Sequence, residues 1–232
     1  MIIIPARLAS TRFPQKALYP IDGVPMVVRV AQRAKEVDEV VVATDSEEIA
    51  KVVREFGFKA VMTSKSHKSG TDRINEAATI LGLTDDQIIL NVQGDEPFIE
   101  PEVIATLKAH TAKHTDAMIC SVYKEEPLDK KDDPNRVKVV TDAAGYALYF
   151  SRSLIPFPRN PYEKVKIHLG LYGYTKKMLE RFCALEPAPL ENIEGLEQLR
   201  ALHHGYQISM TRVESKSVGI DTPEDLQRLG IF

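Results

Sequence analysis

The first half of the chain alternates short apolar runs with amphipathic stretches, and this alternation limits the fold more than any other feature. The apolar runs are typical of strands and lie at residues 2–4, 39–43, 59–62 and 87–92. Helical periodicity fills the intervals between them, over residues 24–37, 46–56 and 72–81. Strands that alternate with helices at such short spacing are typical of a parallel sheet covered on both faces. We therefore expect an α/β fold with a doubly wound, mostly parallel sheet.

The second half follows a different pattern. Four strand-like runs succeed one another with no amphipathic helix between them, at residues 117–122, 137–141, 146–150 and 167–174. Helices are expected at about 176–185, 195–204 and 222–229, and a late strand at 207–213. The sequence therefore predicts a single domain over residues 1–232, with a smaller mixed-sheet lobe inserted at about residues 123–175.

Composition excludes several classes of protein. Charged residues make up 27% of the 232 residues and the net charge is −3, which argues against nucleic acid as a partner. No apolar run reaches the length needed to span a membrane, and the N-terminal run lacks the basic start of a signal peptide. Cys120 and Cys183 lack metal-ligand spacing and are expected to be buried thiols. We therefore expect a cytoplasmic protein with no membrane or nucleic-acid partner.

A loop of small and basic residues follows the first strand. Pro5 ends that strand because proline cannot donate to a β-ladder, and Arg7, Arg12 and Lys16 come soon after it. In an open α/β sheet, ligands bind beyond the carboxyl ends of the strands. Three cations at that edge suit a polyanion such as a nucleoside triphosphate. A solvated basic loop is the alternative, but the density of cations, small residues and turn prolines favours phosphate binding.

Two acidic segments indicate a metal ion. Asp95 follows the fourth strand and would lie on the same edge as the basic loop. A carboxylate beside phosphates repels them unless a cation lies between, and Mg²⁺ is the expected bridge. Asp221 comes just before a helix start at Thr222 and Pro223. If the second half folds back onto the sheet, Asp95 and Asp221 could share one ion.

Neighbouring polar residues have simpler explanations. Glu100 and Glu102 flank a proline at the start of an expected helix, where capping and the helix dipole favour acids. Arg73 lies in the first turn of a helix, against the dipole preference, which suggests that it serves an anion. His110 and His114 are one helical turn apart and could bind a metal, but a solvated helix face is favoured.

Several familiar catalytic motifs are absent from the sequence. It contains no Gly-x-Gly dinucleotide fingerprint, no P-loop, no His-Glu-x-x-His, no Cys-x-x-Cys and no Gly-x-Ser-x-Gly. A nicotinamide-dependent dehydrogenase is therefore disfavoured. A nucleotide-binding regulator without turnover stays open at this stage.

Seven segments of the sequence recur, in this order, in one family of enzymes. They are Ile-Pro-Ala-Arg-x-x-Ser-x-Arg-x-Pro-x-Lys, Gly-Thr-Asp-Arg, Asn-Val-Gln-Gly-Asp-Glu-Pro-Phe-Ile, Ala-Leu-Tyr-Phe-Ser-Arg, His-x-Gly-Leu-Tyr-Gly-Tyr, Glu-Gln-Leu-Arg-Ala-Leu and Gly-Ile-Asp-Thr-Pro-Glu-Asp-Leu. Together they resemble the 3-deoxy-manno-octulosonate cytidylyltransferases, and the match runs from residue 2 to residue 229. Sialate cytidylyltransferases share the opening Ile-Pro-Ala-Arg but usually continue with a glycine-rich stretch.

The resemblance implies a fold like that of the nucleotide-diphospho-sugar transferases and a Mg²⁺-dependent reaction. CTP and 3-deoxy-D-manno-octulosonate (KDO) would give CMP-KDO and pyrophosphate for lipopolysaccharide assembly in a Gram-negative cytoplasm. It also implies a homodimer with the lobe in its interface. The alternative substrates are other acidic sugars, such as sialic acid or an amino variant of KDO.

The resemblance also assigns roles to individual residues. The nucleotide would be bound by Ala6, Arg7, Arg12, Lys16, Thr63, Ser64, Gly70 and Thr71. The sugar would be bound by Arg73, Gln93, His168, Tyr172, Glu197 and Gln198. Asp95 and Asp221 would hold Mg²⁺, and Arg7, Lys16 and Asp95 would act in catalysis.

Overall fold

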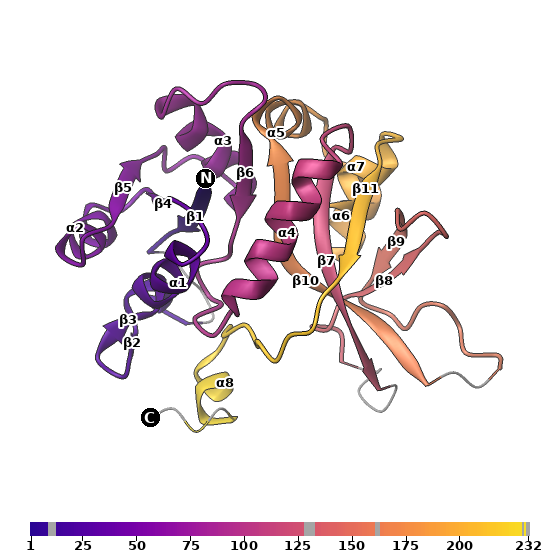
Figure 1. Ribbon diagram of the computed structural model, residues 1–232. Helices are drawn as coiled ribbons and strands as arrows, with labels where there is room; N and C mark the ends of the chain where they lie inside the picture. The colour runs from indigo at the N-terminus through magenta and orange to yellow at the C-terminus, as the bar shows by residue number, and fades with distance from the viewer. Residues whose placement is uncertain (9–12, 128–132, 161–162, 229, 231–232) are drawn as a thin grey trace.

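A single mixed sheet organises the protein (Figure 1). The structure, a computed structural model, describes residues 1–8, 13–127, 133–160, 163–228 and 230. Within these residues, nine strands join in one sheet, and β2 (Pro20–Ile21) pairs separately with β3 (Val24–Pro25). The main path of the sheet runs through β11 (Ile208–Arg212), β7 (Ile119–Pro127), β10 (Lys164–Thr175), β6 (Ile88–Asn91), β1 (Ile2–Ala6), β4 (Val40–Thr44) and β5 (Lys59–Met62).

The four strands that the first half contributes to the main sheet are parallel to one another, as expected, whereas β2 and β3 pair antiparallel outside it. β1 lies between β4 and β6 and is parallel to both, and β5 is parallel to β4. In the second half, β10 is antiparallel to both of its neighbours, β6 and β7, while β11 is parallel to β7. The expectation of an α/β fold with a mostly parallel central sheet is therefore confirmed, with one antiparallel strand built into its centre.

Helices cover both faces of this sheet because successive side chains of each strand point to opposite sides. Ile2 and Ile4 of β1 are buried in one apolar cluster and Ile3 is buried in the other. The first cluster is covered by α1 (Met26–Lys35), α2 (Glu47–Glu55) and α4 (Pro101–Lys113). The second is covered by α3 (Gly70–Ile80), α5 (Lys176–Cys183) and α7 (Leu199–His203).

Local signals explain where several helices begin and end. The Ser46 hydroxyl accepts a hydrogen bond from the Ile49 backbone N–H at 3.4 Å and caps α2, as expected. Of the helix expected over 195–204, only α7 forms, and a second short helix, α6 (Pro189–Glu194), precedes it. Gly195 separates them with a φ of 61°, a left-handed conformation that ends a helix.

A lobe extends from the second half of the sheet. The hairpin of β8 (Lys138–Thr141) and β9 (Ala147–Ser151) attaches where β8 pairs with β10, and it lies at the right of Figure 1. Since β10 also pairs with β6, the same strand belongs to the lobe and to the central sheet. The boundaries of 123–175 for an inserted lobe stay a prediction.

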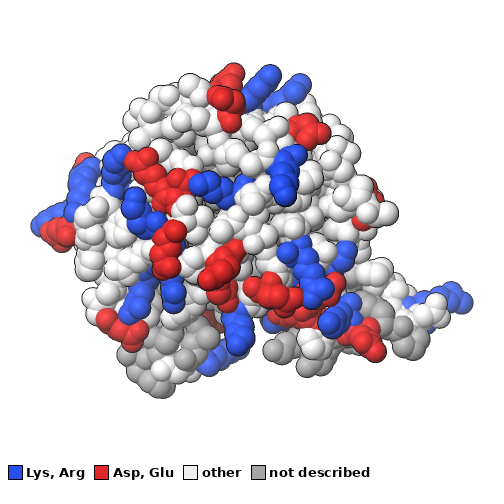
Figure 2. All heavy atoms as spheres, viewed as in Figure 1, with Lys and Arg blue, Asp and Glu red and all other residues white. Residues whose placement is uncertain are grey.

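Charges of both signs are intermingled on the face seen in Figure 2. On β11, for example, Arg212 pairs with Glu125 at 3.2 Å and with Glu214 at 2.6 Å. No helix in the described ranges combines the length and the apolar character that crossing a bilayer requires.

Candidate active site

Three loops enclose a pocket of about 350 Å³ at the carboxyl edge of the parallel strands. They follow β1, β5 and β6, and parallel strands bring such loops to one edge. Gly70 and Gly94 let these loops meet, because a Cβ at either position would lie 3.2 or 3.1 Å from Pro5. The lining residues are Pro5, Ala6, Arg7, Lys16, Ala17, His67, Lys68, Ser69, Gly70, Arg73, Gln93, Gly94, Asp95 and Asp221.

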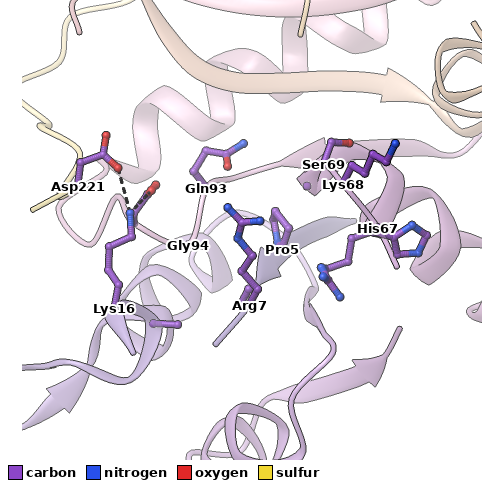
Figure 3. Close-up of a pocket in the computed structure, with 14 residues that line it drawn as sticks. Pro5, Arg7, Lys16, His67, Lys68, Ser69, Gln93, Gly94 and Asp221 are labelled. Carbon is purple, nitrogen blue, oxygen red and sulfur yellow. Dashed lines mark hydrogen bonds and ion pairs between the residues drawn. The ribbon is translucent and has the colours of Figure 1, made fainter. Parts of the chain in front are cut away.

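The Lys16 side chain joins the two acids at one end of the pocket (Figure 3). Its ammonium donates to Asp95 Oδ2 at 2.7 Å and to Asp221 Oδ1 at 3.1 Å. Burial alone would lower the pKa of Lys16, but Asp95 and Asp221 outweigh it and the pKa is raised above its usual value. The structure therefore brings together the three residues that the sequence separated into a basic loop and two acidic segments.

The same two acids could hold a divalent ion. Both carboxylates already face one positive charge, so the space between them suits a cation. No group of three or more His, Cys, Asp or Glu side chains in the described part of the chain could hold a metal by itself. Two carboxylates that leave other positions to phosphate oxygens and water match the usual coordination of Mg²⁺. Asp95 and Asp221 therefore fit that ion.

The remaining cations of the pocket lie along its length. Figure 3 places Lys16 and Asp221 at one end and His67 and Lys68 at the other, with Arg7 between them. Arg7 is exposed, so its guanidinium is accessible to an anionic ligand. Arg12, predicted to bind the nucleotide, lies outside the described residues.

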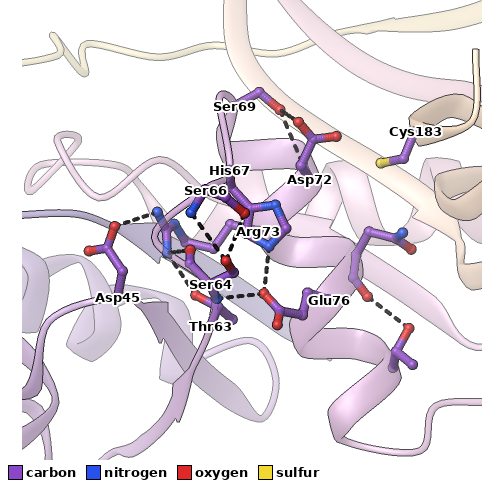
Figure 4. Close-up of polar contacts among 12 residues, drawn as sticks. Asp45, Thr63, Ser64, Ser66, His67, Ser69, Asp72, Arg73, Glu76 and Cys183 are labelled. Atoms are coloured by element: carbon purple, nitrogen blue, oxygen red, sulfur yellow. Dashed lines mark hydrogen bonds and ion pairs between the residues drawn. The ribbon is translucent and has the colours of Figure 1, made fainter. Parts of the chain in front are cut away.

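The loop after β5 is held by two side chains of α3 (Figure 4). Arg73 donates to Asp45 at 2.8 Å and to Thr63 Oγ1 at 2.7 Å. Glu76 accepts the backbone N–H of Ser64 at 2.7 Å. The anion that faces Arg73 is therefore a carboxylate of this chain, although Arg73 also lines the pocket.

Three predicted nucleotide residues lie beside this pocket without lining it in the described part of the chain. They are Thr63, Ser64 and Thr71. The Thr71 hydroxyl donates to Glu197 Oε2 at 2.6 Å, and burial raises the pKa of Glu197. His67, Lys68 and Ser69 line the pocket instead, and sequence reasoning missed them because this stretch carries no distinctive motif. Roles for all of them toward a ligand stay predictions.

A second, larger pocket of about 900 Å³ adjoins the first. Asp95 and Asp221 line both pockets and form their common wall. Three of the predicted sugar residues, His168, Tyr172 and Gln198, line the second pocket, whereas Gln93 lines the first. Glu197 lines neither of the two within the described residues.

The predicted sugar residues of the second pocket form a connected, uncharged set with Ser121. His168 Nε2 is 2.9 Å from the Ser121 hydroxyl, and its Nδ1 is 3.5 Å from the Gln198 amide nitrogen. The Tyr172 hydroxyl donates to Gln198 Oε1 at 3.3 Å. Burial lowers the pKa of His168 to about 3 and raises that of Tyr172, so both stay neutral near pH 7. Such neutral donors and acceptors suit the hydroxyl groups of a sugar.

Apart from Asp95 and Asp221, sequence reasoning missed the charged residues that line the second pocket. Glu96 lines it, and burial followed by the neighbouring Asp95 charge raises the pKa of Glu96 to about 7. The cations Lys124, Arg136 and Arg228 also line it and could face an acidic ligand. No spacing in the sequence marks these cations, because they come from β7, from the segment before β8 and from α8 (Pro223–Arg228).

The histidine pair of α4 has a structural explanation. His110 Nε2 lies 2.9 Å from the Ser209 hydroxyl of β11, and His114 Nδ1 lies 3.0 Å from the His110 carbonyl oxygen. Burial, followed by His114, lowers the pKa of His110 to about 4. Both side chains are half-buried; His110 contacts the sheet at Ser209, and His114 packs against His110.

Comparison with known proteins agrees with this geometry. The sequence model of a family described as Cytidylyltransferase matches residues 1–210. A 3-deoxy-manno-octulosonate cytidylyltransferase of Nitratiruptor sp. is 62% identical, with 99% of this chain and 98% of that one covered. The protein of the same name from Wolinella succinogenes is 56% identical, with 100% and 99% covered.

Solved structures with a similar fold include other enzymes that transfer a nucleotide to a sugar. CMP:2-keto-3-deoxy-manno-octonic acid synthetase complexed with CTP has a TM-score of 0.92 at 38% identity, covering 98% of this chain and 95% of that one. A putative glucose-1-phosphate thymidylyltransferase from Bacillus anthracis shares only the fold, with a TM-score of 0.63 at 18% identity and coverage of 98% and 92%. By sequence over its whole length and by fold, the chain belongs to the 3-deoxy-manno-octulosonate cytidylyltransferase family.

Proposed function

We propose that this chain transfers CMP from CTP to the anomeric hydroxyl of KDO and releases pyrophosphate. One observation carries the proposal: two pockets of different chemistry share a wall made by Asp95 and Asp221. The first pocket has the cations that a triphosphate needs, and the second has the neutral polar groups that a sugar needs. Two substrates in these pockets would place their reacting ends at the shared wall.

The transfer needs no covalent intermediate on the protein. The anomeric oxygen attacks the α-phosphorus, the bond from that phosphorus to the bridging oxygen breaks, and pyrophosphate leaves with the electron pair. The hydroxyl proton passes to solvent. The protein mainly positions the reactants and stabilises charge. Arg7 and Lys16 neutralise the charge that grows on the leaving pyrophosphate.

The sugar is oriented by the neutral set in the second pocket. His168 is held by Ser121 and Gln198, so its ring presents a fixed face to a ligand. Tyr172 is fixed through the same Gln198 side chain. Lys124 and Arg136, which line this pocket and pair with Glu126, supply positive charge near the carboxylate of an acidic sugar.

Mg²⁺ is the proposed cofactor, held by Asp95 and Asp221. When bound there, it supplies a Lewis acid that offsets phosphate charge and lowers the pKa of a bound hydroxyl. Lys16, which contacts both acids, must then share or leave this position, and the triphosphate offers its ammonium other partners.

We further propose a homodimer that uses the lobe. Leu148 of β9, Phe157 and Ile193 of α6 are large apolar side chains that are 62%, 83% and 78% exposed. Apolar surface of this kind is typical of protein–protein contacts. Because CTP is a cytoplasmic nucleotide and KDO is a lipopolysaccharide sugar, we place the reaction in the cytoplasm at the supply of lipopolysaccharide precursors.

The decisive experiment is pyrophosphate release with CTP and Mg²⁺ in the presence of KDO, sialic acid, an amino variant of KDO, or no sugar. Release with KDO alone is the expected result. Release with another acidic sugar would keep the mechanism and change the substrate. CTP binding without release in any arm would refute the transferase and favour a nucleotide-binding regulator. An Asp95→Asn variant serves as the inactive control.

A further inference from the structure

The segment that carries Asp221 crosses the loop that carries Asp95. We call residues 213–221, between β11 and α8, the strap; it has no helix or strand of its own. In Figure 1 it appears as the yellow extended segment that runs from β11 beneath α4 to α8. Segments without regular structure are positioned only by the contacts they make with their surroundings. The contacts of the strap therefore decide where Asp221 lies.

Glu100 makes the strongest of these contacts. Its Oε2 accepts the Ser215 hydroxyl and its Oε1 accepts the Lys216 backbone N–H, both at 2.7 Å. Hydrogen bonds to a carboxylate are about twice as strong as bonds between neutral groups. The Ser217 hydroxyl also donates to Glu96, but at 3.3 Å.

The far end of the strap is tied to the same loop. The Ile220 backbone N–H donates to the Asp95 carbonyl oxygen at 2.9 Å, one residue before Asp221. Glu100 and this backbone bond thus hold the strap at two points on the loop of residues 93–100. Between these points the strap also has longer bonds, since Lys124 donates to the Ser215 and Ser217 carbonyl oxygens at 3.5 and 3.3 Å. Loss of Glu100 therefore removes the two 2.7 Å contacts and leaves the middle of the strap with weaker ones.

The geometry corrects the sequence expectation for Glu100. It is the N-cap residue of α4, yet its side chain makes no capping hydrogen bond. Burial alone would raise the pKa of Glu100, but the Ser215 hydroxyl and the Lys216 N–H outweigh it, and the pKa is lowered. Its charged form is thus committed to the strap and not to the helix.

We propose that Glu100 is a positioning residue that holds Asp221 opposite Asp95 by clamping the strap. This inference rests on the proposed function, since it gives Glu100 its importance through the Mg²⁺ site. Residues that orient a metal ligand typically contribute about 10–100-fold to metal affinity. Glu100 bonds Ser215 and Lys216 and acts on Asp221 only through the backbone of the strap. We therefore expect an effect at the lower end of that range.

The test compares Glu100→Ala and Glu100→Gln with Glu102→Gln. Glu102 is an exposed acid in the same first turn of α4, so it matches Glu100 in charge and helix position. Binding of Mn²⁺ without nucleotide is measured by electron paramagnetic resonance. Amide exchange at Ile220 reports the strap directly. The Mg²⁺ concentration for half-maximal pyrophosphate release provides the kinetic measure.

Glu100→Ala is expected to weaken Mn²⁺ binding about tenfold, to speed exchange at Ile220 and to raise the required Mg²⁺ concentration. Glu100→Gln keeps one acceptor oxygen, so its effect should be intermediate. Glu102→Gln should behave as the wild type. Ser215→Ala removes one of the two bonds from the other side and should reproduce a part of the Glu100→Ala effect.

Two results would overturn the inference. One is a Glu100→Ala protein that is less stable but binds Mn²⁺ as the wild type does, since Glu100 would then be only structural. The other is equal Mn²⁺ binding by the wild type and Asp95→Asn, since no shared ion would then exist. The Mn²⁺ and exchange measurements use no sugar. They can therefore support the inference even if KDO transfer fails.

Discussion

Replacing Lys16 by methionine removes an ammonium that contacts both Asp95 and Asp221 in the free protein. Methionine replaces the apolar part of the lysine side chain and lacks its terminal ammonium, so the substitution mainly deletes charge. We expect the variant to be less stable without divalent ions, because the two carboxylates lose their common partner. We also expect it to gain more stability from Mg²⁺ than the wild type does, since the Lys16 ammonium then no longer competes with the ion.

The size of the effect follows from the contacts. Unit charges about 3 Å apart attract by about 1.4 kcal/mol in water and about 5.5 kcal/mol at an effective dielectric constant of 20. The side chains of Lys16, Asp95 and Asp221 are 16%, 32% and 46% exposed, which favours the lower value. Two such contacts, less the cost of desolvating the ammonium, give about 2 kcal/mol. For a chain of this size that corresponds to about 4–8 °C in Tm.

The assay is thermal unfolding of both proteins with and without Mg²⁺, in the absence of nucleotide. Lys68→Met is the matched control, because Lys68 lines the same pocket at the opposite end. This control should shift by less than about 0.5 kcal/mol and respond to Mg²⁺ as the wild type does. Equal Mg²⁺-induced shifts in Lys16→Met and the wild type would refute the idea that lysine and metal compete for the acid pair.

Three further predictions concern catalysis, pH and packing. Asp95→Asn should lower turnover at least about 100-fold while circular dichroism stays native, and near-normal turnover with Mg²⁺ would remove Asp95 from the site. Because folding lowers the pKa of His168 from 6.5 to about 3, the unfolded chain binds the extra proton first as pH falls. The free energy of unfolding should therefore fall as the pH is lowered from 7 towards 3, by about 2 kcal/mol between pH 7 and 5. In urea titrations, the free energy of unfolding of His168→Gln should depend less on pH than that of the wild type. Gly173→Ala should destabilise by about 1–3 kcal/mol, because its Cβ would lie 2.0 Å from Thr111 Oγ1, whereas Gly170→Ala, 3.8 Å from its neighbour, should unfold in urea close to the wild type.

Local chemistry made parts of the fold predictable from sequence. The helix after Ser46 begins at its cap and ends before Gly57, whose φ is 81°. The strand expected at 59–62 is β5. The ends of this helix and of this strand depend on residues close to them in the chain, so they can be predicted from the sequence alone.

Long-range partners could not be predicted in the same way. The apolar run at 167–174 indicates a strand but not its neighbours, and β10 inserts antiparallel between β6 and β7. Glu100 has the sequence context of a helix cap, yet its carboxylate accepts hydrogen bonds from Ser215 and Lys216 of the strap. Asp95 and Asp221 were expected to share a cation, but nothing in the spacing shows that Lys16 reaches both.

Because the strap lies late in the sequence, the two pockets are completed in a fixed order during synthesis. Lys16 and Asp95 leave the ribosome long before Asp221, so an emerging chain can shape the nucleotide pocket while its second acid is still missing. The wall between the two pockets is completed only when the strap folds back across α4. We therefore expect a nascent chain to recognise its nucleotide before it acquires the ability to transfer it.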